Sequence, residues 1–296
     1  ITGASFTVAS AYIADVSTRE NKAKNFGLIG AAFGIGFIIG PGIGGFFGEI
    51  DIRLPFYIAA GLTFANFLFG YFFVPESLTP ENRRQINFSK MIPGVSLFAL
   101  RNYKGILLLI SAFFLANLAG QALPSTWSYY GIERYDWNPR QIGLSLMVVG
   151  LLVAVVQGFL VGKLVTKFGK RKVIIYGFLL WTVGMFLFSF AHEPWMLYAF
   201  LIPYTLGGIA GPTVQGVISN QVSEKEQGIL QGSITGLVSI TAILGQFIFA
   251  PVFYYFIRPE TSIYFPGAPY ALAAVLLLIA FILATTAIKR MNVEPE

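Results

Sequence analysis

Nine apolar segments most limit what this 296-residue chain can fold into. A helix needs about 20 apolar residues to cross the hydrocarbon core of a bilayer, where every backbone polar group must be satisfied internally. Only 11% of the residues are charged, against about 25% in soluble domains. The sequence therefore predicts an all-α membrane protein with nine transmembrane helices. The segments are roughly 1–15, 26–48, 55–75, 105–130, 141–163, 173–191, 195–219, 229–257 and 269–288.

The basic residues are unevenly divided between alternate loops of this arrangement. One set of loops holds 16 of the 20 lysines and arginines, and the opposite set holds only Arg53, Arg134, Arg140 and Arg258. Because cytoplasmic loops are enriched in lysine and arginine, the bias predicts a cytoplasmic C-terminus. It also explains the net charge of +6 without nucleic-acid binding.

The order of the segments predicts two helical halves. The first segment begins at Ile1 without an initiator methionine or a charged flank, which indicates a fragment. A polar turn followed by glycine occurs at residues 15–27 and again at 221–228, as expected of parallel repeats. We therefore expect helices four to six of a first half at 1–75, a cytoplasmic linker at 76–104 and a complete second half at 105–296. The twelve-helix parent would then have three further helices.

The second segment contains small residues at helical spacing. Small residues let a neighbouring helix approach closely, and a proline inside a helix removes a backbone donor and bends or loosens it. This pattern predicts a helix that packs and moves against others. The candidate conformational residues are Gly36, Gly40, Pro41, Gly44 and Gly45.

Several short motifs are spread over nearly the whole chain. They are Ala11-Tyr-Ile-Ala-Asp15, Gly40-Pro41, Pro75-Glu76-Ser77, Gly120-Gln121, Trp137 with Ile142-Gly143-Leu-Ser145, and Gln221-Val with Gln227-Gly228-x-x-Gln231-Gly232-Ser233. In this order they resemble the tetracycline-resistance type of drug:proton antiporter in the major facilitator superfamily. Residues 36–45 are similar to the antiporter signature of that superfamily's fifth helix. The resemblance implies a major facilitator fold and a secondary transporter, not an enzyme, that exports drugs by alternating access.

The resemblance also implies a gating loop. Residues 162–172 look like the second-half copy of the superfamily's gating loop, so Gly162, Gly169 and Arg171 become candidates for gating. Thr166 stands where that loop often carries aspartate, which departs from the charge-relay form of the gate.

Two further departures concern the substrate. Trp181 and Val153 stand where tetracycline pumps carry an intramembrane aspartate and a histidine. Intramembrane acids are kept for ions or protons, and tryptophan supplies an aromatic wall instead. We therefore expect a relative with altered drug specificity, with tetracycline itself disfavoured.

The sequence places no acidic residue in the middle of a segment. If the coupling ion is H⁺, its carrier lies on the three absent helices, or Asp15 serves at the cytoplasmic mouth. Asp15 and Arg19 are one helical turn apart and can pair when that end closes. An ion pair at a helix end in headgroup water is the simpler interpretation.

Polar side chains at helical spacing on several segments predict a substrate cavity, because polar groups facing lipid are penalised. Trp127, Trp181 and Tyr204 are the predicted stacking wall for a flat or cationic organic molecule. Hydrogen bonds between helices, worth about 0.6 kcal/mol each, are the alternative interpretation of the polar residues. The candidate cavity residues are Asn117, Gln121, Trp127, Gln157, Trp181, Tyr204, Gln215, Gln231, Thr235 and Gln246.

Other classes of function lack their signatures. The chain has no cysteine, one histidine and no phosphate-binding glycine loop before a Lys-Ser/Thr pair, so no metal site and no cofactor are expected. An intramembrane enzyme or a receptor lacks a catalytic pair within the spans. We expect a monomer in the bacterial inner membrane, with a small organic substrate, H⁺ and lipid as its partners. A nutrient symporter or facilitator of the same superfamily remains the alternative.

Overall fold

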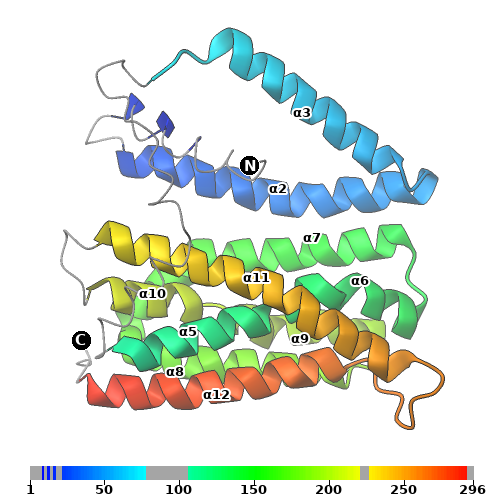
Figure 1. Cartoon of the computed structure of the whole chain (residues 1–296), viewed down its shortest axis with the longest axis vertical. Helices are drawn as coiled ribbons and strands as arrows, with labels where there is room; N and C mark the ends of the chain where they lie inside the picture. The colour runs from blue at the N-terminus through cyan, green and yellow to red at the C-terminus, as the bar shows by residue number, and fades with distance from the viewer. Residues whose placement is uncertain are drawn as a thin grey trace, which may run out of the picture. The chain divides into compact units, whose positions relative to one another are not determined.

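The computed structural model describes residues 9, 12, 13, 16, 17, 22–77, 106–220 and 227–291. Every regular element in these residues is helical (Figure 1). The chain divides into two compact units. Unit 1 comprises residues 1–88 and 138–151, and unit 2 comprises residues 89–137 and 152–296.

Six helical stretches within the described residues are long and apolar enough to cross a membrane. Pro139–Ser189, with 51 residues, contains two of the predicted segments, and Gly34–Ile50 is apolar but shorter. The all-α membrane fold predicted from the sequence is confirmed. Most of the first predicted segment lies outside the described residues, so the total of nine stays a prediction. The six are Leu54–Phe73, Leu107–Tyr135, Pro139–Ser189, Pro194–Asn220, Gly232–Ile257 and Ala268–Arg290.

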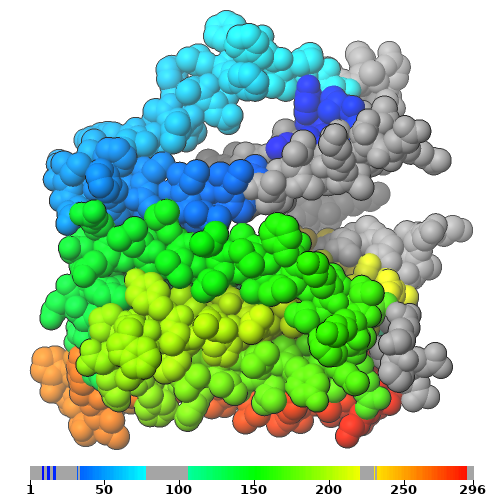
Figure 2. Space-filling view, turned by 180° about the vertical axis from the view of Figure 1, so that it is seen from behind, coloured from blue at the N-terminus to red at the C-terminus, as the bar shows by residue number. Residues whose placement is uncertain are grey.

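Unit 1 contains α2 (Lys22–Ile50), α3 (Leu54–Phe73) and the first part of α7 (Pro139–Val155). A short turn joins α2 to α3, and the Asp51 carboxylate accepts a 2.7 Å hydrogen bond from the Arg53 backbone N–H there. α3 buries none of its side chains, and Figure 2 shows its surface in cyan. A helix that is apolar all round and unburied by protein is suited to lipid contact.

Unit 2 contains the remaining helices. α12 packs against α5 and α8, and α8 also packs against α9. The buried face of α12 carries small residues at intervals of three and four, which permit close helix packing. The bounds are α5 (Leu107–Gly120), α6 (Ala122–Tyr135), η6 (Val156–Leu160), α8 (Val161–Ser189), α9 (Pro194–Gly207), α10 (Ala210–Asn220), α11 (Gln227–Ile257) and α12 (Ala268–Arg290).

Within α8, Gly169 marks a turn between two helical parts. Its φ of 76° and ψ of 154° lie in a region that essentially only glycine adopts. Val156 before the turn and Val173 after it belong to one buried cluster with Ile209. The turn at Gly169 therefore divides the 51-residue stretch Pro139–Ser189 into two helical rods, 139–168 and 170–189, in agreement with the predicted segments 141–163 and 173–191.

At the other end of unit 2, polar contacts join the end of α6 to two loops. The Tyr264 hydroxyl donates a 2.9 Å hydrogen bond to Glu133, and the neighbouring Arg134 contacts Nδ1 of His192. Partial burial, and then the Glu133 carboxylate that accepts its hydrogen bond, raise the pKa of the Tyr264 hydroxyl. Tyr264 therefore remains a protonated donor at neutral pH.

Candidate functional site

Two spanning helices of unit 2 are interrupted near their middles. Gln121 lies in a turn between α5 and α6, and Gly208 and Ile209 lie in a turn between α9 and α10. A third irregularity is the π-helical turn η6, which contains Gln157. Broken helices are tolerated at membrane depth only where protein or a wet cavity covers them, and they form the binding sites of many transporters.

Trp181 of α8 contacts both interruptions. A Cβ added to Gly120, at the end of α5, would lie 3.3 Å from Cζ2 of the Trp181 ring. A Cβ added to Gly207, at the end of α9, would lie 2.5 Å from the Trp181 Cβ, closer than real Cβ atoms come. Only glycine at position 207 lets α9 approach Trp181 so closely, whereas at position 120 a side chain would need the indole to shift by a few tenths of an ångström. The indole Nε1–H is buried and has no hydrogen-bond partner among the described residues.

An aromatic cluster extends from Trp181 within unit 2. The Trp181 and Tyr204 rings meet edge to face with centroids 6.3 Å apart, and Phe188 lies 5.5 Å from Tyr204 and 5.6 Å from Trp127. The structure thus joins the three predicted stacking residues through Phe188. Trp127 is only 2% exposed, so its part of the cluster is closed core. Sequence reasoning missed Phe188, although it follows Trp181 by seven residues on the same helical face.

Gln121 packs against α11. A Cβ on Gly245 would lie 2.8 Å from Cγ of Gln121, so the glutamine side chain covers this glycine. Asn117, one turn earlier, is partly buried and donates a 2.8 Å hydrogen bond to the Phe113 carbonyl. Of these two predicted cavity residues, Gln121 therefore lies at the helix interruption, and the Asn117 amide binds its own helix.

In unit 1, α2 and α7 meet glycine to glycine. A Cβ on buried Gly45 would lie 2.7 Å from the Pro139 carbonyl oxygen and 2.8 Å from the Gly143 Cα. Farther along, a Cβ on Gly150 would lie 3.0 Å from the Phe37 carbonyl oxygen. At Gly45 and Gly143 the two backbones approach this closely because neither residue carries a side chain.

The family model described as Major Facilitator Superfamily matches residues 1–161 and 109–296. The chain belongs to this superfamily. It is 38% identical over 253 residues to the class C tetracycline resistance protein of Escherichia coli, covering 86% of the chain but 64% of that protein. The class H protein of Pasteurella multocida is 31% identical over 293 residues, covering 96% of the chain and 70% of that protein.

A solved structure supports the same fold. The human organic anion transporter MFSD10 (TETRAN) superposes with a TM-score of 0.64 at 21% identity, covering 93% of this chain and 66% of that one. The major facilitator fold predicted from the motifs is thereby confirmed, and its relatives include several tetracycline resistance proteins, as the motifs indicated.

The remaining cavity candidates of this major facilitator member differ in exposure. Gln157, Thr235 and Gln246 are exposed on spanning helices, whereas Tyr204 and Gln215 are partly buried. The side chain of Gln231 lies outside the described residues. Exposed amides are disfavoured against lipid, so a wet cavity remains the predicted location for Gln157 and Gln246. Their role in binding stays a prediction.

The conformational candidates fall into two groups on α2. Gly45 forms the contact with α7, and the Pro41 carbonyl oxygen faces Gly143 there. A Cβ on Gly36, Gly40 or Gly44 would meet nothing within 4 Å. Among the described residues, α2 therefore packs through Gly45, and the other three glycines have no neighbour there; that they form a packing face stays a prediction. α2 also continues through Pro41 as one helix.

The other conformational candidates lie at or near the turn in α8. Gly169 is the turn itself, Arg171 is partly buried just after it, and Gly162 lies two turns before it. Asp15 and Arg19 lie outside the described residues. Gating by any of these residues stays a prediction.

Proposed function

We propose that this protein is a secondary transporter that exports a drug-like organic molecule in exchange for protons by alternating access. The observation that carries the proposal is the contact of Trp181 with two interrupted helices. Interrupted helices at the midplane form substrate sites in secondary transporters, because their free backbone groups and flexible turns face the cavity. The names of the tetracycline resistance relatives support a drug as the substrate.

The proposed site combines aromatic and uncharged polar groups. Trp181 and Tyr204 offer ring faces, and Gln121 offers an amide at the interruption between α5 and α6. Trp181 and Val153 stand at the positions where, by resemblance, tetracycline pumps carry their aspartate and histidine. A flat organic molecule other than tetracycline suits this site, because it can stack on the rings without an intramembrane carboxylate.

The proposed movement uses the contact between α2 and α7. These helices belong to different six-helix halves in the proposed division at 1–75, 76–104 and 105–296. Backbone meets backbone at Gly45, and the side chain over the neighbouring Gly42 is the flexible Met147. Little rigid interlocking therefore opposes a rocking of the two halves about the site as substrate and proton binding shift the equilibrium. Gly36, Gly40 and Gly44 would meet a neighbour in another state of the cycle.

The location and the coupling follow from the charges. The positive loops support a cytoplasmic C-terminus, and the bacterial relatives support a bacterial inner membrane. We propose that the protein acts there as a monomer. Asp15 is the candidate proton carrier in this chain, and Arg19 is its proposed partner when the cytoplasmic end is closed. An acidic group that changes partners with the conformational state couples protonation to movement.

Efflux at imposed pH gradients tests the proposal. Inverted membrane vesicles containing the protein should accumulate a fluorescent drug when their interior is acidified, and collapse of the gradient should release it. Vesicles without the protein are the control. Accumulation that ignores the pH gradient would contradict proton coupling, and proton-driven uptake by whole cells would support the nutrient-symporter alternative.

A further inference from the structure

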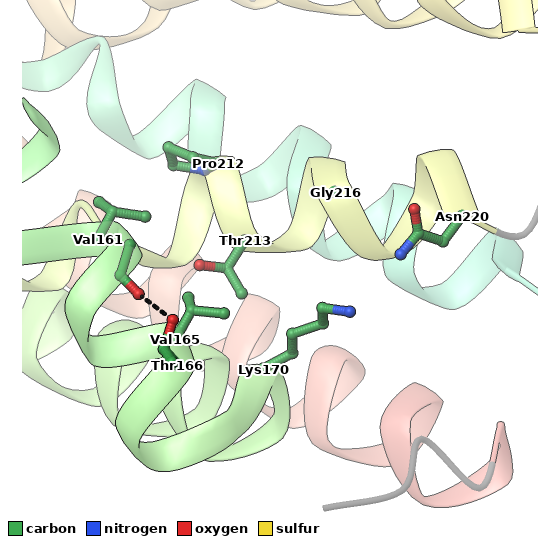
Figure 3. Close-up of a pocket in the computed structure, with 9 residues that line it drawn as sticks. Val161, Val165, Thr166, Lys170, Pro212, Thr213, Gly216 and Asn220 are labelled. Atoms are coloured by element: carbon green, nitrogen blue, oxygen red, sulfur yellow. Dashed lines mark hydrogen bonds between the residues drawn. The ribbon is translucent and has the colours of Figure 1, made fainter. Parts of the chain in front are cut away.

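A cavity of about 350 Å³ lies in unit 2, beside the turn at Gly169 (Figure 3). It is bounded by the first part of α8 on one side and by α10 on the other, with Lys170 entering from just beyond the turn. This volume is at the lower end of the roughly 300–1,000 Å³ of small-molecule sites. The lining residues are Val161, Gly162, Val165, Thr166, Lys170, Pro212, Thr213, Gly216 and Asn220.

The lining carries a positive charge, and none of the described residues gives it a counterion. Lys170 is partly buried, and none of the nine lining residues is acidic. Thr166, at the position where the resemblance expects aspartate, supplies a hydroxyl instead of a carboxylate. Burying part of a cation without an anion is unfavourable, so an anionic ligand would stabilise this arrangement.

The free hydrogen-bond donors gather at one end of the cavity. The Thr166 hydroxyl donates to the Gly162 carbonyl at 2.9 Å, and the Thr213 hydroxyl donates to the Ile209 carbonyl at 2.8 Å. The Lys170 ammonium and the Asn220 amide have no partners among the described residues, and Figure 3 shows both nitrogens toward the same end. These two groups can therefore donate to one anion.

The other end of the cavity is apolar. Val161, Val165 and Pro212 line it, and Gly162 and Gly216 leave the space between the helices open, since a Cβ on either would meet nothing within 4 Å. The site thus pairs a cationic, donating end with a hydrocarbon wall. It lies among basic residues in the segment 163–172, which the positive-inside bias places at the cytoplasmic headgroup layer.

We propose that this cavity binds the phosphate of an anionic phospholipid headgroup. Basic pockets between transmembrane helices on the cytoplasmic side bind such headgroups. The Lys170 ammonium and the Asn220 amide donate to the phosphate oxygens, and the glycerol and first acyl carbons lie along Val161, Val165 and Pro212. The bound lipid joins the turn of α8 to the end of α10. This binding site is additional to the proposed transport site at Trp181.

The first test compares lipid binding by matched charge variants. The purified protein, stripped of lipid in neutral detergent, is titrated with phosphatidylglycerol or phosphatidylcholine and examined by native mass spectrometry. Lys170→Gln should weaken phosphatidylglycerol binding about tenfold, the effect of one charged hydrogen bond. Lys172→Gln removes the same charge from an exposed residue outside the lining and should leave binding within about twofold. Equal losses in both variants would overturn the proposal.

A second variant tests the cavity itself. Gly216→Leu places a side chain where nothing lies within 4 Å of the added Cβ, so the fold should persist while the cavity is filled. Unchanged elution and helicity with lost phosphatidylglycerol binding support the site, and retained binding contradicts it. Glycerol 3-phosphate separates the two sources of phosphate: if it binds as tightly as phosphatidylglycerol, the ligand is a soluble phosphate ester and the lipid assignment is wrong. Equal binding of phosphatidylcholine would also contradict the anionic preference.

Discussion

The contact of α2 with α7 in unit 1 and the contact of α8 with α9 in unit 2 both depend on glycine, yet they differ in their surroundings. Gly207 and Gly184 face the backbones of Trp181 and Tyr204, whose rings continue into a closed aromatic core. Gly45 instead faces bare backbone on α7, the Met147 side chain lies over Gly42, and a Cβ on Gly44 would meet nothing within 4 Å among the described residues. The same residue type is thus enclosed by a closed aromatic core in one contact, and by backbone and a single flexible side chain in the other.

The largest effect on stability is expected at the contact of α8 with α9. Gly207→Leu places a side chain against the Trp181 backbone, which cannot move aside without disturbing both interrupted helices. Destabilisation of about 3 kcal/mol or more should prevent recovery of folded protein. Fluorescence-detected gel filtration measures this, with Gly211→Leu on α10 as the control because its Cβ would meet nothing within 4 Å. Similar recovery of both variants would show that the contact of α8 with α9 tolerates a side chain at position 207.

A smaller loss of stability is expected at the contact of α2 with α7. Gly45→Leu overpacks the approach to Gly143 and should cost about 1–3 kcal/mol, seen as a lower apparent melting temperature with folded protein still recovered. Gly44→Leu is the matched control, since the adjacent glycine faces open space on the same helix. If both variants melt alike, the contact between α2 and α7 does not contribute to stability.

Trp181→Phe should change stability by less than about 1 kcal/mol, because it removes a buried donor that lacks a partner while retaining an aromatic ring. Under the proposed function, drug affinity should fall about fivefold if the indole N–H donates to the substrate. Equilibrium binding measures the affinity, and Trp195→Phe at a 63% exposed position is the control. Unchanged affinity would remove the indole N–H from the proposed site.

The smallest change in stability is expected for Gly40→Leu, within about 0.5 kcal/mol, because the added side chain meets nothing in this structure. Export should nevertheless be lost if the open face of α2 meets a neighbour in another state of the cycle. Gly61→Leu on α3 adds the same bulk to an open position of another membrane helix and should retain export. Normal export by the Gly40 variant would contradict a role for this face.

The sequence predicted the helices well where an uninterrupted apolar run sets their length. The run 269–288 became Ala268–Arg290, and the run 55–75 became Leu54–Phe73. The uninterrupted apolar run 195–219 did not predict the interruption at Gly208, although Gly207, Gly208 and Pro212 were local signals for it. Hydrophobicity reports the length of a span, and it does not reveal a turn of apolar residues inside that span.

Which helices pack against one another could not be predicted from the sequence. The small-residue spacing on α2 predicted a packed face, but only the fold shows that Gly143 of α7, far along the chain, approaches Gly45 within that face. The position of Trp181 was singled out by resemblance, whereas its contacts with Gly120 and Gly207 depend on tertiary structure. No local signal distinguishes the π-helical turn at Val156–Leu160 from the regular helix around it.

Trp181 has an evolutionary consequence because its ring contacts Gly120 on α5 and the Tyr204 ring on α9, and both of these helices are interrupted. A substitution there changes contacts with both helices at once. Under the proposed function, a library randomised at residue 181 alone should therefore yield more distinct drug-resistance profiles than one randomised at Val153.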